Sequence, residues 1–329
     1  MPNIVLNLQR NLLEYFNAVG LDTMFEIFAS MLHERRIIVT SSKLHRLSAC
    51  VQAANSIMYP MFWQHIFIPI LPRQLIPYLQ APMPFLIGVP APMMSHVRME
   101  ELGEVVILDA DANRVVSPFQ DLLGLPDDVV ANFRRAQKAQ GRDLAGDAVA
   151  RLFLRATVHL IGGYRSALKM RPGEKITFDD DAFLNTRSST VRPFLETILQ
   201  LQIFRQFIED RLQMLNDGKV GSDEFEKEIL IFAEKLSKSN SARVKAAALG
   251  SSVKRESGAI VKAVKENVKT QGMTAFASQF STDSDSQQNG FFSLISQSCS
   301  QASRQIGESQ WKVSLQRCQV EDEREPFVV

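Results

Sequence analysis

The sequence predicts an α/β three-layer unit with a mostly parallel sheet, followed by an all-helical unit and a largely disordered C-terminal tail. In the first third of the chain, helix-patterned segments alternate with short apolar runs, as in parallel α/β folds. Further on, apolar residues recur only at helical spacing, and the last part is rich in Ser and Gln. The predicted divisions are an α/β unit at 1–118, a helical unit at 119–233, a basic segment able to form a helix at 234–270, and a disordered tail at 271–329.

The first predicted helix ends in a charged corner. Asp22 is placed to cap this helix, whose apolar residues repeat at helical spacing as far as His33. Arg35 and Arg36 follow at its negative dipole end, where cations are favoured. A zinc-binding HExxH helix would need a second His where this chain has Ile37. The corner is therefore predicted to be a turn from a helix into a buried strand.

Four apolar, β-branched runs are predicted strands. The first ends at the pair Ser41 and Ser42, which we expect to cap the next helix. Pro69 indicates that the second strand ends there or lies at a sheet edge. The predicted strands are 37–40, 64–70, 83–89 and 105–109, and the helix between the first two is 44–58.

Three long helices are predicted beyond residue 118. They cover 126–140, 146–169 and 190–215, and the first opens on a proline followed by two acidic residues. The segment 178–183, Phe-Asp-Asp-Asp-Ala-Phe, resembles an acidic-aromatic peptide of the kind that binds endocytic adaptors. Because it lies between predicted helices, we expect Phe178 and Phe183 to anchor the core and Asp179 to cap a helix.

Composition excludes several functional classes. The formal net charge of +1 offers no field for nucleic acid, so no nucleic-acid partner is expected. The three cysteines and five histidines are scattered, and no phosphate-binding or nucleophile-elbow motif occurs. We therefore expect no catalytic residues, no metal and no cofactor. No signal peptide is evident. Between Arg46 and Arg98 the only formal charge is Arg73, but eight prolines interrupt this stretch, so a transmembrane helix is not expected.

The segment 234–270 is strongly basic, with nine Lys and Arg against three Glu. Ile260, Val261, Val264 and Val268 would share one face of a helix there. Such a helix is suited to an anionic membrane surface, although a solvated helix or a disordered segment fits the sequence equally well. The candidate membrane-binding residues are Lys254, Arg255, Lys262, Lys265 and Lys269.

Eight segments of the chain, taken in order, carry a family resemblance. They are ASMLHERRIIVTSSKL (29–44), YPMFWQHIFIPILP (59–72), APMPFLIGV (81–89), VVILDADANRVVSPFQDLLGLPDDV (105–129), GDAVARLFLRA (146–156), GGYRSALKMRPGEKITF (162–178), LQIFRQFIEDRLQMLN (201–216) and SGAIVKAVK (257–265). The first three resemble the central block of a DENN domain, and together the eight resemble the connecdenn subfamily, with its central DENN and downstream dDENN regions. The resemblance runs from about residue 11 to 225, with a weaker match to about 270, and does not cover the end of the chain.

This resemblance implies a guanine nucleotide exchange factor for a Rab-family small GTPase in clathrin-mediated endocytosis and endosomal recycling. Such a factor breaks no covalent bond and is not an enzyme in that sense. It binds the nucleotide-free GTPase more tightly than the loaded one, and this difference in affinity drives nucleotide release. The resemblance also implies a cytoplasmic protein at the periphery of clathrin-coated vesicles and of endosomal or plasma membranes. An anionic phosphoinositide membrane and the clathrin adaptor machinery are its further expected partners.

Members of this family grip the GTPase with a longin-like N-terminal (uDENN) module as well as the central block. Here the sequence starts almost inside the central block, so the longin module is expected to be missing and exchange by this chain alone to be impaired. A short isoform and an incomplete gene product both fit. The alternative function is a non-catalytic scaffold or competitor that binds a Rab or a membrane without exchange. An unrecognised hydrolase would need convergent titratable groups.

Binding in open α/β sheets takes place at loops beyond the carboxyl ends of the strands. The loop after the fourth predicted strand offers Asp109, Asp111 and Asn113. The loop after the third offers an apolar tip that contains Pro90 and Met93. These five residues are the predicted partner contacts, although Asp109 could instead simply close a turn.

Overall fold

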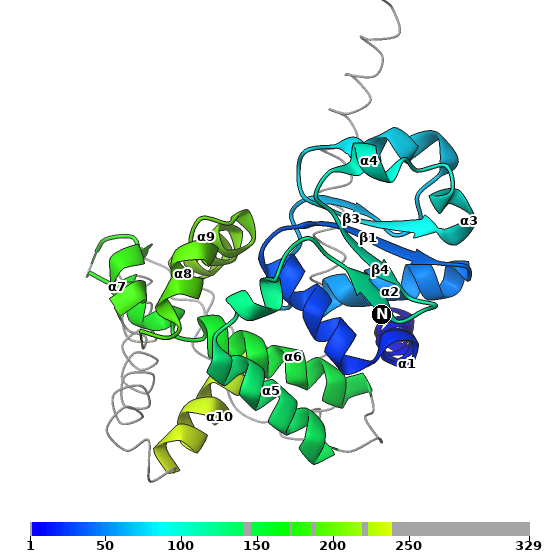
Figure 1. Cartoon of the computed structure of the whole chain (residues 1–329). Coiled ribbons are helices and arrows are strands. Elements are labelled where there is room, and N and C mark those ends of the chain that lie inside the picture. Colours follow the sequence, from blue (N-terminus) through cyan, green and yellow to red (C-terminus); the bar gives the residue numbers. More distant parts are fainter. Residues whose placement is uncertain (1, 141–145, 172, 186–188, 219–222, 239–329) are drawn as a thin grey trace, which may run out of the picture.

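The computed structural model describes residues 2–140, 146–171, 173–185, 189–218 and 223–238. Its first part is a five-stranded sheet with the strand order β2-β3-β1-β4-β5 (Figure 1). The elements of this part are α1 (Pro2–Leu32), β1 (Arg36–Ser41), α2 (Leu44–Ser56), β2 (Ile66–Ile68), the 3-10 helix η1 (Arg73–Gln80), β3 (Phe85–Pro90), α3 (Ala91–Met94), α4 (Met99–Leu102), β4 (Val106–Asp109) and β5 (Arg114–Val116).

The sheet is mixed. β1 lies between β3 and β4 and is parallel to both, and β2 is parallel to β3. β5 runs antiparallel to β4, with Leu108 opposite Val115. The four predicted strands are therefore present, but the sequence interpretation missed β5, because a run of three residues is too short to show a strand pattern.

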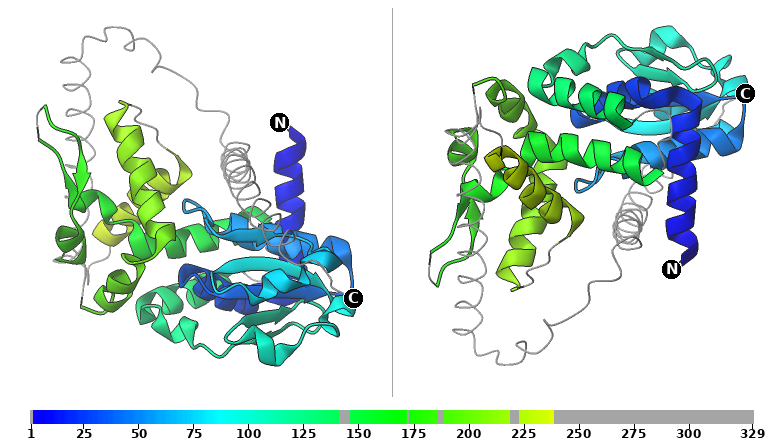
Figure 2. Two further views of the ribbon diagram at one scale, coloured as in Figure 1. Left: turned by 90° about the horizontal axis from the view of Figure 1, so that it is seen from above. Right: turned by 90° about the horizontal axis from the view of Figure 1, so that it is seen from below.

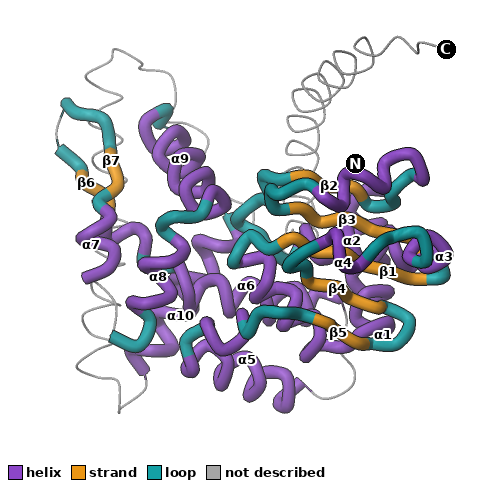
Figure 3. The backbone as a smooth tube through the Cα atoms, turned by 45° about the horizontal axis from the view of Figure 1, so that its top comes forward, coloured by secondary structure: helices purple, strands orange, loops and turns teal. Residues whose placement is uncertain are grey.

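Both faces of the sheet are covered. Ile37 and Val39 of β1 belong to a core that includes α1 and α2, whereas Ile38 belongs to a second core under η1 and α4. This alternation follows from the two-residue period of a strand. Figure 1 shows α3 and α4 on one side of the strands and α1 and α2 on the other, and the tube view shows the strands in their order from β2 to β5 (Figure 3). The predicted three-layer arrangement is present, but one outer layer consists of short helices and loops.

Helix α1 is much longer than predicted and is broken at Gly20, whose φ of 69° is left-handed. Asp22 lies just beyond this break, and its carboxylate accepts a hydrogen bond at 3.4 Å from Gln137. The helix before the break was not predicted. The predicted cap by Ser41 and Ser42 is wrong in detail, because the N-cap residue of α2 is Lys43. The Ser41 hydroxyl oxygen instead accepts the backbone N–H of Lys43 at 3.1 Å.

The second part is mostly helical but not entirely so. The elements of this second part are the 3-10 helices η2 (Asp121–Gly124) and η3 (Tyr164–Ala167), the helices α5 (Asp127–Gln140), α6 (Gly146–Ile161), α7 (Asp180–Asn185), α8 (Arg192–Ile198), α9 (Gln202–Asn216) and α10 (Glu224–Lys238), and the strands β6 (Leu168–Lys169) and β7 (Thr177–Phe178). The prediction of an all-helical unit is therefore wrong, because β6 and β7 pair as a small antiparallel sheet.

Two predicted helices are shorter than expected. The helix predicted at 146–169 ends at Ile161, and Gly162 follows in a place where a Cβ would lie 3.2 Å from Ile229. The helix predicted at 190–215 is divided between α8 and α9. The prediction for 178–183 is confirmed for Phe183, which is fully buried, and for Asp179, which accepts the backbone N–H of Ala182 at 3.1 Å. Phe178 is only half-buried against the same core.

The two parts share one continuous core. The ring of Phe25 in α1 stacks on that of Phe133 in α5 with centroids 3.9 Å apart. The ring of Phe28 meets that of Phe153 in α6 edge to face at 5.3 Å. Two further views show α5 and α6 lying along the second half of α1 (Figure 2). The predicted boundary at residue 118 stays a prediction.

Over the described ranges, no helix combines the length and the apolar character that crossing a membrane requires. Helix α10 begins before the predicted basic segment and ends at Lys238 within it. The rest of that segment, with the candidate residues Lys254, Arg255, Lys262, Lys265 and Lys269, and the tail at 271–329 lie outside the described residues.

Candidate partner-binding site

All five predicted partner contacts lie at one edge of the sheet. The parallel strands β1, β3 and β4 end together there, with Ser41 opposite Pro90 and Thr40 opposite Asp109. The turn between β4 and β5 carries the three polar candidates on one side of β1. On the other side, Pro90 ends β3, and Met93 in α3 packs half-buried on the second core.

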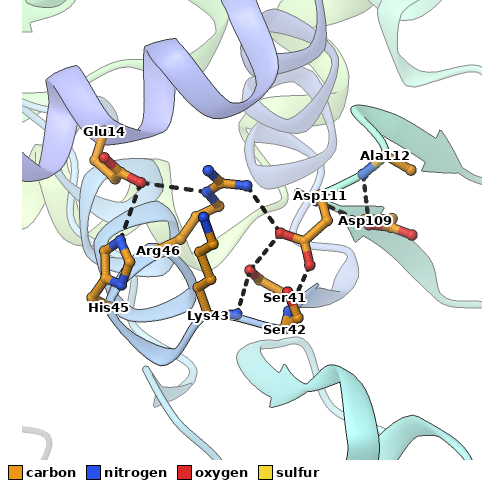
Figure 4. A network of polar contacts seen from close by, with 9 residues as sticks. All are labelled: Glu14, Ser41, Ser42, Lys43, His45, Arg46, Asp109, Asp111 and Ala112. Atoms are coloured by element: carbon orange, nitrogen blue, oxygen red, sulfur yellow. Dashed lines mark hydrogen bonds and ion pairs between the residues drawn. The ribbon is translucent and has the colours of Figure 1, made fainter.

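Asp111 is the centre of a polar network at this edge (Figure 4). Its carboxylate accepts hydrogen bonds from the Ser42 backbone N–H at 2.6 Å, from Ser41 Oγ at 2.9 Å and from the Arg46 guanidinium at 3.0 Å. The backbone N–H of Ser42 is the main cause that lowers the pKa of Asp111 to about 2, and the two serine side chains and Arg46 contribute. Asp111 is therefore a carboxylate at every physiological pH.

Arg46 extends the network to α1. Its Nε lies 3.4 Å from Glu14 Oε1, and the same oxygen is 3.6 Å from His45 Nε2 (Figure 4). Arg46 therefore bridges a carboxylate on α1 and one on the β4–β5 turn. This bridge fixes the position of the turn relative to the start of α2, because a guanidinium can serve two acceptors at once.

The β4–β5 turn is held by its own polar side chains. Asp109 Oδ1 accepts the backbone N–H groups of Asp111 and Ala112, both at 3.0 Å. Asn113 has a left-handed φ of 49°, and its Oδ1 accepts a hydrogen bond from Thr23 Oγ1 of α1 at 2.7 Å. Asp109 thus closes the turn, as the sequence interpretation allowed, while the turn itself remains exposed to solvent. Whether these residues contact a partner stays a prediction.

The sequence interpretation missed the residues that support and flank this turn. Ser41, Arg46 and Glu14 come from three separate elements, and no local pattern shows that they meet. Lys43 and Leu44 are also exposed at this edge, where Leu44 keeps 53% of its surface in solvent. Leu44 was placed only as the first residue of the predicted helix 44–58. No local pattern shows that the first residue of a helix is exposed.

The charged corner at 33–36 contacts the helical part instead of the sheet edge. Glu34 accepts the backbone N–H of Ile203 at 2.7 Å at the start of α9, and it lies 3.0 Å from His65 Nε2. Burial raises the pKa of Glu34, but the hydrogen bonds and the charge of His65 outweigh this effect and lower it overall. Arg35 donates to Asp121 Oδ1 at 2.8 Å. The predicted turn from a helix into a buried strand is confirmed, since α1 ends at Leu32 and β1 begins at Arg36. Its contacts with the helical part, which make it a joint between the two parts, were not predicted.

A second polar cluster is enclosed in the helical part. Glu226 of α10 accepts a hydrogen bond from Tyr164 and lies 2.5 Å from Arg165. Arg211 of α9 pairs with Asp223 at 2.5 Å. Burial raises the pKa of the Tyr164 hydroxyl, and the adjacent charge of Glu226 raises it further. Because these groups satisfy one another away from solvent, the cluster is suited to holding α9 and α10 together.

The described part of the chain contains no group of three or more His, Cys, Asp or Glu side chains arranged to hold a metal ion. Two of the histidines each lie beside a single carboxylate: His33 is 3.8 Å from Asp121, and His65 is 3.0 Å from Glu34. At the sheet edge, the network around Asp111 holds an exposed turn in a fixed position.

Comparison with known proteins identifies both parts of the chain. The DENN (AEX-3) domain family matches residues 6–113, and the dDENN domain family matches residues 178–228. DENN domain-containing protein 1B from Mus musculus is 51% identical over 220 residues, which are 67% of this chain and 29% of that protein. DENN domain-containing protein 1A from Homo sapiens is 47% identical over 70% of this chain and 22% of its own length.

DENN domain-containing protein 1C from Mus musculus is 43% identical over 70% of this chain and 29% of its own length. The chain therefore spans less than a third of each of these relatives. Together these matches confirm the resemblance to connecdenn proteins that was inferred from the quoted segments.

Proposed function

Because this chain belongs to the DENN domain family, we propose that it acts in GDP–GTP exchange on a Rab-family small GTPase, in clathrin-mediated endocytosis and endosomal recycling. The observation that carries the proposal is the exposed β4–β5 turn, which Asp111, Arg46 and Glu14 hold in one position. A surface fixed in advance loses little conformational entropy when it binds. Such a surface favours the GTPase conformation that fits it, here the nucleotide-free one.

The proposed contact surface comprises the turn residues Asp109, Asp111 and Asn113 together with Pro90 and Met93. We add the exposed pair Lys43 and Leu44, which lie between the two groups at the end of β1. Asp109 and Asp111 use carboxylate oxygens for the turn and the network, so their contribution is mainly to its shape. Leu44 supplies apolar contact area at its centre.

The test is release of fluorescent GDP from a panel of Rab proteins, together with binding to the nucleotide-free form of each. The chain should bind at least one nucleotide-free Rab and accelerate release of GDP from it. Arg46→Gln, which removes the bridge between the turn and α1, should weaken binding about tenfold because the turn loses its support. Arg73→Gln, on the exposed face of η1, is the matched control. Absence of both binding and exchange across the panel would contradict the proposal.

The same experiment separates the alternative function. A non-catalytic scaffold or competitor would bind a Rab with normal affinity and leave GDP release unchanged. It would also slow exchange by an active relative in a mixed assay. This result would retain the contact surface and reject exchange activity.

Membrane association is a separate proposal. Lys254, Arg255, Lys262, Lys265 and Lys269 would attract an anionic phosphoinositide surface, with about 1 kcal/mol per basic residue near the bilayer. Association through these residues would place the protein on the cytoplasmic side of clathrin-coated vesicles and of endosomal or plasma membranes, where clathrin adaptors also act. Sedimentation with vesicles containing a phosphoinositide should fall when Lys262, Lys265 and Lys269 are changed to Gln. Equal binding of the variant would contradict it.

A further inference from the structure

The segment after β5 contains the one Ser/Thr-Pro dipeptide of the 329-residue sequence, Ser117–Pro118. Arg114 stands three residues before the serine. A proline directly after a serine removes a backbone N–H that would otherwise need a partner in a substrate groove. This dipeptide is the recognition element that proline-directed serine/threonine kinases require. Neither Ser117 nor Pro118 is among the candidate partner contacts at the sheet edge.

The fold presents this dipeptide at the free side of the sheet. β5 is the last strand in the sheet order, with β4 as its one neighbour among the described strands. Along this segment Arg114, Val116 and Pro118 are exposed, and the residues between them are half-buried. Alternating exposure of this kind is typical of extended chain, the form in which peptide segments enter a binding groove.

The hydroxyl of Ser117 makes local hydrogen bonds. It donates to the backbone oxygen of Phe119 at 3.1 Å and accepts the backbone N–H of Phe119 at 3.0 Å. Both bonds lie within two residues of the serine, as in a serine turn. Turning the hydroxyl outward therefore requires a local rearrangement of this turn, without separating two secondary-structure elements.

We propose that Ser117 is a phosphoacceptor for a proline-directed serine/threonine kinase, and that its phosphate loosens the joint between Arg35, Phe119 and Asp121. In the transfer, Ser117 Oγ forms a bond to the γ-phosphorus of ATP and the bond from that phosphorus to the β-phosphate oxygen breaks. ADP leaves, and the hydroxyl proton passes to a base of the kinase.

The consequence follows from the neighbours of Phe119. The Arg35 guanidinium carbon lies 3.8 Å above the Phe119 ring, and Arg35 also donates to Asp121 through Nη2 at 2.8 Å and Nε at 3.1 Å. A phosphoserine two residues away adds close to two negative charges and strong acceptor oxygens, which compete with Asp121 for Arg35. The Asp121 side chain is only 5% exposed, with His33 as its other basic neighbour at 3.8 Å. Losing Arg35 would leave a poorly compensated buried carboxylate.

This joint connects the sheet with the helical part. Arg35 directly precedes β1 of the sheet, and Asp121 is the first residue of η2 in the second part, which packs against α1. Phosphorylation would therefore act on the connection between the two parts. The proposal does not depend on exchange activity.

The first test treats the folded, full chain with a proline-directed kinase and ATP and maps phosphate by mass spectrometry. We expect phosphate at Ser117 and its loss in Ser117→Ala. Phosphate on other serines only, or on a synthetic 111–123 peptide but not on the folded chain, would overturn the proposal.

The second test compares hydrogen exchange in the phosphorylated and unphosphorylated chain. We expect exchange across residues 119–125 to be about tenfold faster after phosphorylation, the effect of one lost hydrogen bond to a charged group. Arg35→Lys, which keeps the charge but loses the two-pronged contact, should show faster exchange beforehand and a smaller further increase. An unchanged rate of amide hydrogen exchange in the phosphorylated chain would show that the phosphate does not loosen the joint, and would overturn that part of the proposal.

Discussion

The molecule contains two polar networks built from the same chemical groups in opposite surroundings. At the sheet edge, Asp111 and Arg46 pair with side chains that are 32% and 24% exposed. Between α9 and α10, Arg211 and Glu226 pair with side chains that are 10% and 4% exposed. The edge network joins α1, α2 and the β4–β5 turn, and the enclosed network joins η3, α9 and α10, but only the edge network borders solvent.

This difference in exposure separates their roles. A charge that is deeply buried must keep its partners, because leaving it unpaired costs several kcal/mol. A charge pair at the surface contributes about 1 kcal/mol or less, since water and salt screen it. The enclosed cluster therefore bears mainly on stability, whereas the edge network bears mainly on the shape of an exposed turn. Substitutions in the two networks should separate these effects.

The largest expected effect comes from Glu226→Ala in the enclosed cluster. The substitution removes the buried carboxylate that accepts a hydrogen bond from Tyr164 and pairs with Arg165. The free energy of unfolding should fall by about 3–5 kcal/mol, measured by urea denaturation. Lys227→Ala, at the next residue on the exposed face of α10, should change it by less than about 0.5 kcal/mol. Similar losses for the two variants would show that burial does not set the effect.

The second effect tests the joint between the parts. Glu34→Gln keeps the shape of the side chain but removes the charge that accepts from the start of α9 and pairs with His65. We expect a loss of about 1–2 kcal/mol near neutral pH, as for a lost helix cap. Because the pKa of Glu34 is lowered on folding, its contribution is present above its ordinary pKa and is lost as the pH falls through the folded value. The unfolding difference between wild type and variant should therefore shrink in acid, and a constant difference would contradict this account.

Much of the fold could be predicted from local patterns. The runs at 37–40 and 83–89, which contribute most of β1 and β3, show the apolar and partly β-branched character that a strand between two layers requires. Asp179 as a cap and Phe183 as a core anchor also follow from short-range chemistry, and the structure confirms both. Strand β5 could not be predicted, because its three residues pair with β4 through a turn that depends on the left-handed Asn113.

The candidate edge could be predicted only in part. The rule that loops at the carboxyl ends of parallel strands bind partners located Asp109 and Pro90 at the same edge. Arg46 and Glu14 were not predicted, because their bridge depends on how α1 packs against α2. Sequence patterns predict which face of an element is buried, but tertiary packing decides which exposed side chains meet.

The third effect concerns Asp111 at the edge. Its pKa of about 2 lies below its ordinary value of 3.8, so the stability it contributes is present above that value and is lost as the pH falls towards 2. Because the Asp111 side chain borders solvent, which screens its charge, Asp111→Asn should lower the free energy of unfolding by only about 1 kcal/mol at neutral pH. Thermal unfolding of the two proteins should converge between pH 4 and 2. Persistence of the difference there would assign the loss to hydrogen-bond geometry instead of charge.

The smallest effect on stability, and the sharpest separation from the enclosed cluster, is expected from Leu44→Ser. Leu44 is 53% exposed at the start of α2, so its removal should change the free energy of unfolding by less than about 0.5 kcal/mol. If the edge binds a GTPase, the same change should weaken binding about tenfold, because an apolar side chain at the centre of an interface loses its buried contact area. Leu230→Ser on α10, 39% exposed and far from this edge in the sequence, is the matched control and should leave binding unchanged. Equal affinities for both variants would move the partner surface away from the end of β1 while leaving the stability comparison intact.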